Sequence, residues 1–194
     1  MKRICVFCGS SRGRRDAYAD AARTMARALV DRGLGLVYGG GSVGLMGILA
    51  DAVLDAGGEA IGVLPRGLAR KEYAHERLTT LHLVGSMHER KALMASLADG
   101  FAALPGGLGT LEEVFEILTW AQLGIHQKPV GLVDVEDYWA GLRGLLRHAV
   151  REGFVRLEYA GLLLIEPTPA ALLDRFAAWR PPDGAPVWLD SSET

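Results

Sequence analysis

The sequence has little of what membrane, secreted or disulfide-stabilised proteins need. Only two of its 194 residues are cysteine, and an acidic, basic or glycine residue interrupts every apolar run. No run therefore approaches the roughly 20 apolar residues that span a bilayer. The apolar stretch near the N-terminus ends after about five residues, which is too short for the core of a signal peptide. We expect a cytoplasmic protein with no membrane partner.

Metal-binding and nucleophile motifs are also missing. The five histidines form no HxxxH or HExxH pair, which disfavours a zinc site. Cys5 and Cys8 stand on an apparent strand whose alternate side chains point to opposite faces, so we expect buried thiols without a disulfide or shared metal. A GxSxG serine turn is absent, and four lysines without a frame for pyridoxal phosphate give Schiff-base chemistry little support. We expect neither a metal nor a cofactor.

The composition is that of an ordinary globular protein, with 49% hydrophobic and 23% charged residues. Its length fits one domain, which we place over residues 1–180. Residues 181–194 mix proline, glycine, aspartate and serine, so we expect a loosely attached tail there. A net charge of -2 gives no general attraction to nucleic acid. The expected partner is a small molecule.

Short apolar runs alternate with longer amphipathic segments along the chain. This alternation predicts an α/β fold with a Rossmann-like, doubly wound parallel sheet and helices on both faces. The expected strands are 4–8, 34–38, 60–64, 81–84, 101–104, 130–133 and 162–165. The expected helices are 18–30, 45–54, 87–97, 111–123, 138–150 and 170–179.

The loops that follow the expected strands hold most of the glycine clusters in the chain. In a doubly wound sheet, ligands bind in the crevice beyond the carboxyl ends of the strands. Function is therefore expected in these loops, which are 9–13, 39–44, 65–76, 85–91 and 105–110.

The strongest signal is Pro105-Gly106-Gly107-Leu108-Gly109-Thr110, which joins a strand to a helix. Glycine lets the backbone approach a ligand closely, and the first helical N–H groups and the helix dipole attract anions. The loop is therefore predicted to hold a phosphate, with Thr110 either capping the helix or donating its hydroxyl. The alternative is a tight turn in which Thr110 caps the helix and Glu113 completes a capping box. No Lys-Ser or Lys-Thr pair follows, so this is not a Walker A loop.

A second glycine loop, Gly39-x-Gly41-x-x-Gly44, matches the dinucleotide-binding pattern between a strand and a helix. Taken alone, it would suggest NAD. The acid that binds the ribose should stand at the end of the following strand, but Glu59 stands at its start. The NAD interpretation is therefore disfavoured.

Paired cations open the helix expected at 87–97. Arg90 and Lys91 oppose the helix dipole there, and a bound anion would remove that cost. Arg90 offers a planar fork for a phosphate or carboxylate, and Lys91 offers a point charge. The alternative is an ordinary solvated face.

Two motifs together resemble the Lonely Guy (LOG) family, the cytokinin riboside 5'-monophosphate phosphoribohydrolases. They are Pro105-Gly106-Gly107-x-Gly109-Thr110-x-x-Glu113 and Met87-x-x-Arg90-Lys91, and the resemblance runs from Ile4 to about Pro167. It implies hydrolysis of the N-glycosidic bond of adenosine 5'-monophosphate (AMP), plain or N6-modified. The products would be the free base, a cytokinin or adenine, and ribose 5-phosphate.

The resemblance also implies site residues. Arg90 and Glu113 match the catalytic pair, and Gly107, Gly109 and Thr110 match the phosphate position, with Gly106 shaping the turn. Leu108 stands where many relatives have tyrosine, and residues 68–72 differ from the usual proline-containing version, so both bear on the choice of base. Glu112 is the second carboxylate beside Glu113. Further positions near the substrate are Glu72, Lys91, Thr119, Ser10, Gly40 and Gly41.

The implied chemistry agrees with the loop positions. Breaking a ribosyl C–N bond passes through an oxocarbenium-like state, which a carboxylate at Glu113 can stabilise while holding hydroxyls or activating water. Arg90 would orient Glu113 or the substrate. Helix 111–123 has more apolar surface than one sheet face needs, and the resemblance also implies pairing, so we expect a homodimer. A non-catalytic nucleotide sensor or carrier of Rossmann-like fold is the alternative function.

Overall fold

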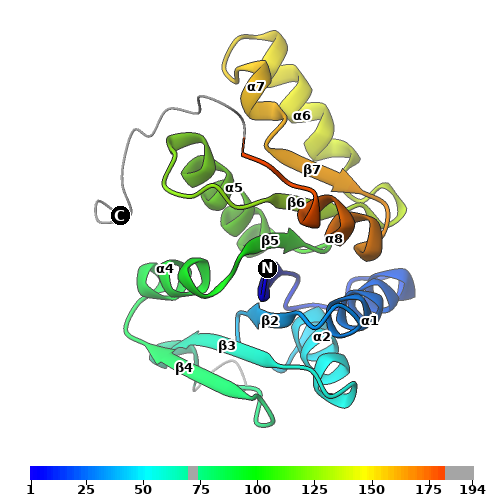
Figure 1. Ribbon diagram of the computed structural model, residues 1–194, viewed down its shortest axis with the longest axis vertical. Coiled ribbons are helices and arrows are strands. Elements are labelled where there is room, and N and C mark those ends of the chain that lie inside the picture. The colour runs from blue at the N-terminus through cyan, green and yellow to red at the C-terminus, as the bar shows by residue number, and fades with distance from the viewer. Residues whose placement is uncertain (70–73, 182–194) are drawn as a thin grey trace.

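The computed structural model describes residues 1–69 and 74–181. Within these residues the strands form a seven-stranded parallel sheet in the order β4-β3-β2-β1-β5-β6-β7 (Figure 1). The predicted doubly wound sheet is confirmed, and each strand lies within about one residue of its expected bounds. The strands are β1 (Arg3–Phe7), β2 (Gly35–Tyr38), β3 (Ala60–Pro65), β4 (Thr80–Val84), β5 (Gly100–Ala103), β6 (Val130–Val133) and β7 (Leu163–Glu166).

The centre of the sheet is the point at which the strand order reverses. Cys5 of β1 is paired with Val37 of β2 on one side and with Phe101 of β5 on the other. Loops that leave the carboxyl ends of β1 and β5 turn to opposite faces of the sheet, so a crevice opens between them. The topology therefore places the loops after β1 and β5 side by side.

The helices differ from expectation at several ends. α4 has the predicted bounds, whereas α5 begins at Leu108 instead of Leu111, and α3 and α7, of four residues each, were not predicted. A 3-10 turn, η1, delays the start of α6 to Ala140. The helices are α1 (Asp16–Val30), α2 (Gly44–Asp55), α3 (Arg66–Ala69), α4 (Met87–Leu97), α5 (Leu108–Leu123), η1 (Val135–Asp137), α6 (Ala140–Arg151), α7 (Leu157–Ala160) and α8 (Pro169–Ala177).

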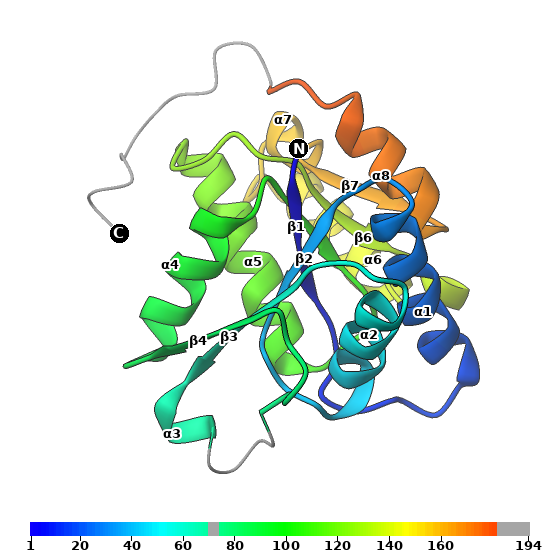
Figure 2. The same ribbon diagram turned by 60° about the horizontal axis from the view of Figure 1, so that its bottom comes forward.

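The sheet separates two apolar layers. Helices α1, α2 and α8 cover one face, while α4 and α5 cover the other (Figure 2). Alternate residues of β1 enter the two layers: Ile4 and Val6 face the first, and Cys5 and Phe7 face the second. Cys5 and Cys8 are buried and unbonded, as expected.

The remaining expectations concern the chain ends and membranes. Nearly all of the predicted tail lies outside the described residues. Among the helices of residues 1–69 and 74–181, none combines the length and apolar character needed to cross a bilayer.

Candidate active site

The glycine loop after β5 ends in the first turn of α5. Gly107 is the N-cap and the helix begins at Leu108, so Thr110 is its third residue and the capping-box alternative is wrong. The N–H groups of the first helical turn have no intrahelical partner. Gly107 has no side chain that could accept a hydrogen bond from them, so they remain available to a ligand. Burial of the Thr110 side chain, only 4% exposed, anchors this turn against the protein.

The glycines of this loop have two different roles. A Cβ on Gly106 would lie 2.0 Å from the Thr110 hydroxyl oxygen, so the chain needs glycine there for packing. A Cβ on Gly107 or Gly109 would meet no atom of the described residues within 4 Å. Leu108, between them, is 86% exposed. The backbone of Gly107 to Gly109 therefore faces open space in which an anion can approach it closely.

The loop after β1 packs directly on this turn. The Gly9 N–H donates to the Pro105 carbonyl at 3.1 Å, and the Gly9 carbonyl accepts from the Leu45 N–H at 3.0 Å. Gly44 has a φ of +62°, and a Cβ there would lie 2.2 Å from the Ser10 carbonyl carbon. Three loops thus meet at the reversal of strand order. They surround a pocket of about 270 Å³, lined by Gly9 to Gly13, Tyr18, Leu45, Pro105 to Gly107 and Tyr138.

Two tyrosines that the sequence analysis missed form a wall of this pocket. The Tyr138 hydroxyl donates to the Gly106 carbonyl at 2.5 Å, and its ring lies edge-on to Tyr18 at 5.7 Å. Tyr138 comes from the segment after β6, whose carboxyl end neighbours that of β5. No local motif in the sequence marks Tyr138 as a pocket residue. Its position just after a strand that neighbours β5 is the one feature from which it could have been predicted.

Arg90 crosses the floor of the crevice from α4. Its Nε donates to the Val63 carbonyl at 3.1 Å, and its Nη2 donates to the Gly39 carbonyl at 3.4 Å. A Cβ on Gly39 would lie 2.1 Å from Nη2, so the guanidinium fills the space that glycine leaves. Nη1 lies 3.6 Å from Glu113 Oε1 on α5. The solvated-face alternative is wrong for Arg90, because the residue is only 9% exposed.

Glu113 is a buried carboxyl poised for proton exchange. Burial raises its pKa from the ordinary 4.5 to about 7, although Arg90 acts in the opposite direction. The neighbouring carboxylate of Glu112 adds to the rise. A carboxyl with a pKa near neutrality can both accept and return a proton during a reaction.

The adjacent glutamates point in different directions. Glu113 faces Arg90, while Glu112 Oε1 lies 2.5 Å from Lys91 Nζ, and Glu116 Oε1 lies 2.8 Å from the same nitrogen. Burial lowers the pKa of Lys91, but its hydrogen bonds to the two glutamates outweigh burial and the pKa is raised. Lys91 therefore ties α4 to α5, with its charge balanced by protein carboxylates.

Other predicted positions are spread more widely. Ser10 lines the pocket, whereas Gly40 (φ +78°) packs on Leu64 and Leu81. The Gly41 carbonyl accepts from the Tyr38 hydroxyl at 3.2 Å, so both glycines shape the rim. Glu72 lies outside the described residues.

Thr119 is the predicted residue farthest along α5. Its hydroxyl donates to the Phe115 carbonyl at 2.7 Å and it is exposed. At 1.5 Å per residue, it stands about 16 Å along the helix from Leu108. The structure does not bring it to the glycine turn.

The NAD interpretation gains no support from the second glycine loop. Glu59 stands at the amino edge of the sheet, away from the crevice, where Oε2 accepts from Arg3 Nε at 2.8 Å. Protein atoms fill the space beside the loop glycines, with Arg90 at Gly39 and the Ser10 backbone at Gly44. Close approach of a pyrophosphate would need that space.

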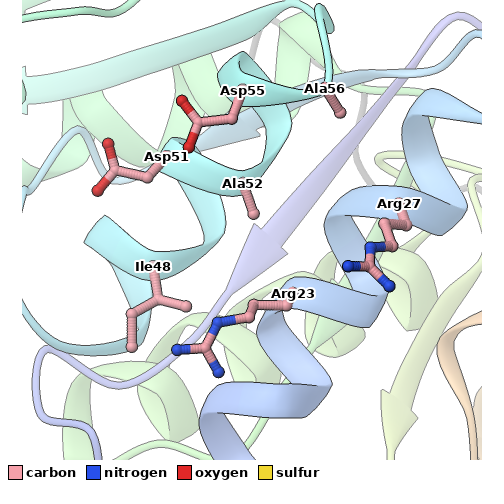
Figure 3. A pocket seen from close by; sticks show the side chains of 7 residues that line it. All are labelled: Arg23, Arg27, Ile48, Asp51, Ala52, Asp55 and Ala56. Carbon is pink, nitrogen blue, oxygen red and sulfur yellow. The ribbon is translucent and has the colours of Figure 1, made fainter.

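A separate hollow of about 470 Å³ lies between α1 and α2 (Figure 3). Arg23 and Arg27 project from α1, and Asp51 and Asp55 stand on α2. Both aspartates form ion pairs with Arg77, at 3.0 Å for Asp55. Arg77 thus balances the two carboxylates, and Arg23 Nη1 lies 2.8 Å from Asp20 Oδ1.

The fold and site define a Rossmann-like protein whose ligand crevice lies at the reversal of strand order. The crevice combines an open glycine turn at a helix N-terminus with a buried arginine–glutamate pair. Over 92% of this chain and 99% of the other, the structure resembles the molybdenum cofactor carrier protein of Chlamydomonas reinhardtii, with a TM-score of 0.69 and 22% identity. A molybdenum cofactor binding protein of Rippkaea orientalis gives a TM-score of 0.68 at 21% identity over 92% and 97% of the two chains. These likenesses concern the fold.

Sequence relatives identify the family. Residues 46–176 match a family described as "Possible lysine decarboxylase". The chain is 49% identical over 181 residues to the cytokinin riboside 5'-monophosphate phosphoribohydrolase LOG5 of Arabidopsis thaliana, covering 93% of this chain and 79% of that protein. It is 47% identical to the enzyme LOG of Oryza sativa subsp. japonica, covering 93% and 75%. The chain belongs to the LOG family.

Proposed function

We propose that this protein hydrolyses the N-glycosidic bond of AMP or an N6-substituted AMP, releasing the free base and ribose 5-phosphate. One observation carries the proposal: the buried Arg90–Glu113 pair lies about one and a half helical turns from the open N-terminus of α5. A single nucleotide can therefore place its phosphate on the turn and its ribose beside the carboxyl. The names of the curated relatives describe the same reaction.

The 5'-phosphate is proposed to bind at Gly107, Gly109 and Thr110. The N–H groups of the first helical turn point at this position, and the helix dipole favours negative charge there. Gly107 and Gly109 leave the approach open, while Gly106 holds the turn against Thr110. The phosphate thereby fixes the distance between the sugar and Glu113.

Glu113 is proposed to act on the ribose and the attacking water. As the C–N bond breaks, its electron pair leaves with the base, and the ribose carbon gains positive charge that a nearby carboxylate stabilises. A water oxygen then bonds to that carbon, and its surplus proton ends on the departing base. Glu113 can hold a ribose hydroxyl or accept the water proton, since its pKa is about 7.

Arg90 is proposed to position this carboxylate. Two backbone carbonyls hold the guanidinium, which leaves Nη1 directed at Glu113. An arginine fixed in this way needs little reorganisation during the reaction. Its charge also keeps part of the Glu113 population ionised despite burial.

The family description as a possible lysine decarboxylase has little support in this chain. Schiff-base catalysis needs a lysine that is free to deprotonate and attack. Lys91 is held by two glutamates, and the Lys128 ammonium donates to the Ala95 carbonyl at 2.8 Å. Lys71 lies outside the described residues.

Base release tests the proposed function directly. Purified protein is incubated with AMP and, separately, with isopentenyladenosine monophosphate, and the free base is quantified by chromatography. We expect release from at least one nucleotide that scales with protein concentration and nearly disappears in Glu113→Gln. Tight binding of both nucleotides without release would instead favour the sensor or carrier alternative.

A homodimer is also proposed. α6, which lies wholly within the described chain, has no buried residue, and it borders an apolar groove of about 440 Å³ shared with α7 and β7. Phe154 and Leu157, after α6, are 88% and 78% exposed, and Phe115 on α5 is 38% exposed. Such apolar surface favours a protein contact. Light scattering at micromolar concentration should give at least twice the chain mass of 20.8 kDa, and a strictly monomeric mass would refute pairing.

A cytoplasmic location completes the proposal. A nucleoside monophosphate hydrolase needs access to the nucleotide pool inside the cell. Fractionation of the native host, followed by detection of the protein with an antibody, should recover it with cytoplasmic markers, and recovery with membranes or in the medium would contradict this location.

A further inference from the structure

We propose that Arg12 supplies the positive charge that binds the 5'-phosphate, so that this residue makes the crevice prefer a nucleoside monophosphate over the nucleoside. The inference rests on the proposed function, and Arg12 lies in the loop 9–13, outside the two motifs that carry the family resemblance. Arg12 lines the 270 Å³ pocket together with Ser10, Gly106 and Gly107. It therefore faces the same space as Gly107, the first residue of the open glycine turn.

The loop that carries Arg12 is fixed at both ends. Gly9 is hydrogen-bonded to Pro105 and Leu45 on either side of the crevice. Gly13 has a φ of +71°, and a Cβ there would lie 2.6 Å from the ring of Tyr18, so the chain turns tightly against that ring. The backbone of Arg12 is thus held at the pocket rim, and only its side chain has to adjust to a ligand.

A phosphate in this pocket would need a positively charged partner, which the other lining residues do not supply. Of the described residues that line it, Arg12 is the only charged one. A phosphate monoester carries about two negative charges near pH 7. Backbone N–H groups and hydroxyls satisfy its oxygens but supply no full positive charge, whereas a guanidinium binds a phosphate through two parallel hydrogen bonds.

Three neighbouring cations are already committed, and a fourth, Arg14, does not line the pocket. Lys91 lies between Glu112 and Glu116, and Arg90 is buried beside Glu113. Arg15 Nη1 lies 2.6 Å from Glu136 Oε2. Arg12, by contrast, forms no ion pair within residues 1–69 and 74–181, and it is exposed. It is therefore available to an incoming phosphate without breaking an internal contact.

The expected signature separates binding from catalysis. The phosphate is not the reacting group, so Arg12 contacts it equally in the ground state and in the transition state. Loss of such a contact raises KM and leaves kcat nearly unchanged. An exposed arginine on a phosphate is expected to change affinity by about tenfold. Adenosine, which lacks the phosphate, should not respond to the substitution.

The test compares Arg12→Ala, Arg12→Lys and the matched control Arg14→Ala with the wild type. Arg14 is an exposed arginine two positions away that does not line the pocket. Calorimetry measures binding of ribose 5-phosphate, and steady-state assays measure KM and kcat for AMP and kcat/KM for adenosine. Using a product for the binding arm keeps that measurement independent of turnover.

We expect Arg12→Ala to weaken ribose 5-phosphate about tenfold and to raise KM for AMP similarly, with kcat within about twofold. Arg12→Lys should recover part of the loss, because it restores charge without the planar fork. Arg14→Ala should match the wild type. Equal binding by Arg12→Ala and the wild type, or an equal loss in Arg14→Ala, would overturn the inference. Arg12-dependent binding in a protein that releases no base would overturn only the hydrolase function.

Discussion

The two glycine-rich loops of this protein have similar sequences and different surroundings. In Gly39 to Gly44, the space that side chains would take is filled by the Arg90 guanidinium, the Met46 side chain and the Ser10 backbone. At Gly107 and Gly109, no atom of residues 1–69 or 74–181 occupies that space. A glycine cluster thus indicates that other atoms come close to the backbone, but only the fold shows whether those atoms belong to the protein or could belong to a ligand. The first loop packs the crevice together, and the second is the one that we propose to bind the phosphate.

The largest expected effect concerns the carboxyl beside the open loop. Glu113→Gln keeps the size of the side chain but removes its charge, so turnover of AMP should fall about a hundredfold or more while AMP binding persists. Glu112→Gln is the matched control, because Glu112 faces Lys91 instead of Arg90. Base release at saturating AMP measures both. Near-normal turnover in a correctly folded Glu113→Gln would make Glu112 or Glu72 the next candidate.

Substitution of glycine by alanine should have opposite effects on stability in the filled loop, Gly39 to Gly44, and in the open turn at Gly107 and Gly109. Gly44→Ala places a Cβ 2.2 Å from backbone atoms at a φ of +62°, which should lower the free energy of unfolding by about 3 kcal/mol. Gly109→Ala meets open space, so stability should stay equal or rise by up to about 1 kcal/mol, because alanine favours helix. Its Cβ should instead crowd the phosphate and raise KM for AMP. Urea unfolding and AMP kinetics of the two variants separate these effects, and equal stability losses would contradict the comparison.

Gly39→Ala should show a third pattern. The new Cβ would lie 2.1 Å from Arg90 Nη2, so the guanidinium would have to move away from the Gly39 carbonyl and from Glu113. Because this movement leaves buried polar groups without partners, turnover should fall by about tenfold, and urea unfolding should show a loss of about 1–3 kcal/mol. Turnover equal to the wild type would show that the position of Arg90 does not matter.

Much of this arrangement can be predicted from the sequence, because buried strands and helices have characteristic patterns of apolar residues. The strands and α4 were predicted closely, since apolar runs and helical spacing are local properties. The start of α5 was misplaced, because glycine disfavours helix and the sequence therefore predicts a loop at residues 108–110, which the structure has in the first helical turn. Tyr138 carries no local motif, and only the strand order brings it to the pocket, whereas Arg12 stands in the loop 9–13 that the sequence predicts to be functional.

The effect of pH should be smaller than the effects of these substitutions. As the pH rises, activity should increase, whereas the contribution of Glu113 to stability should decrease. If Glu113 acts as a carboxylate, kcat/KM should rise with pH and level off above about pH 7. The folded state holds the Glu113 proton more tightly than the unfolded state, so this group's contribution to stability falls as the pH rises from 4.5 to about 7. Glu113→Gln should remove that fall, which urea unfolding at pH 5 and pH 8 measures. A wild-type rate that is flat between pH 5 and pH 8 would contradict the assigned role.

A crystal structure of Glu113→Gln with AMP tests most directly which glycine loop holds the nucleotide. We expect this variant to bind AMP and to turn it over at least about a hundredfold more slowly, so that the intact substrate can be seen. We predict the phosphate on the N–H groups of Gly107 to Thr110, with the ribose carbon of the C–N bond beside residue 113. AMP bound with its phosphate on Gly39 to Gly44, away from residue 113, would contradict it.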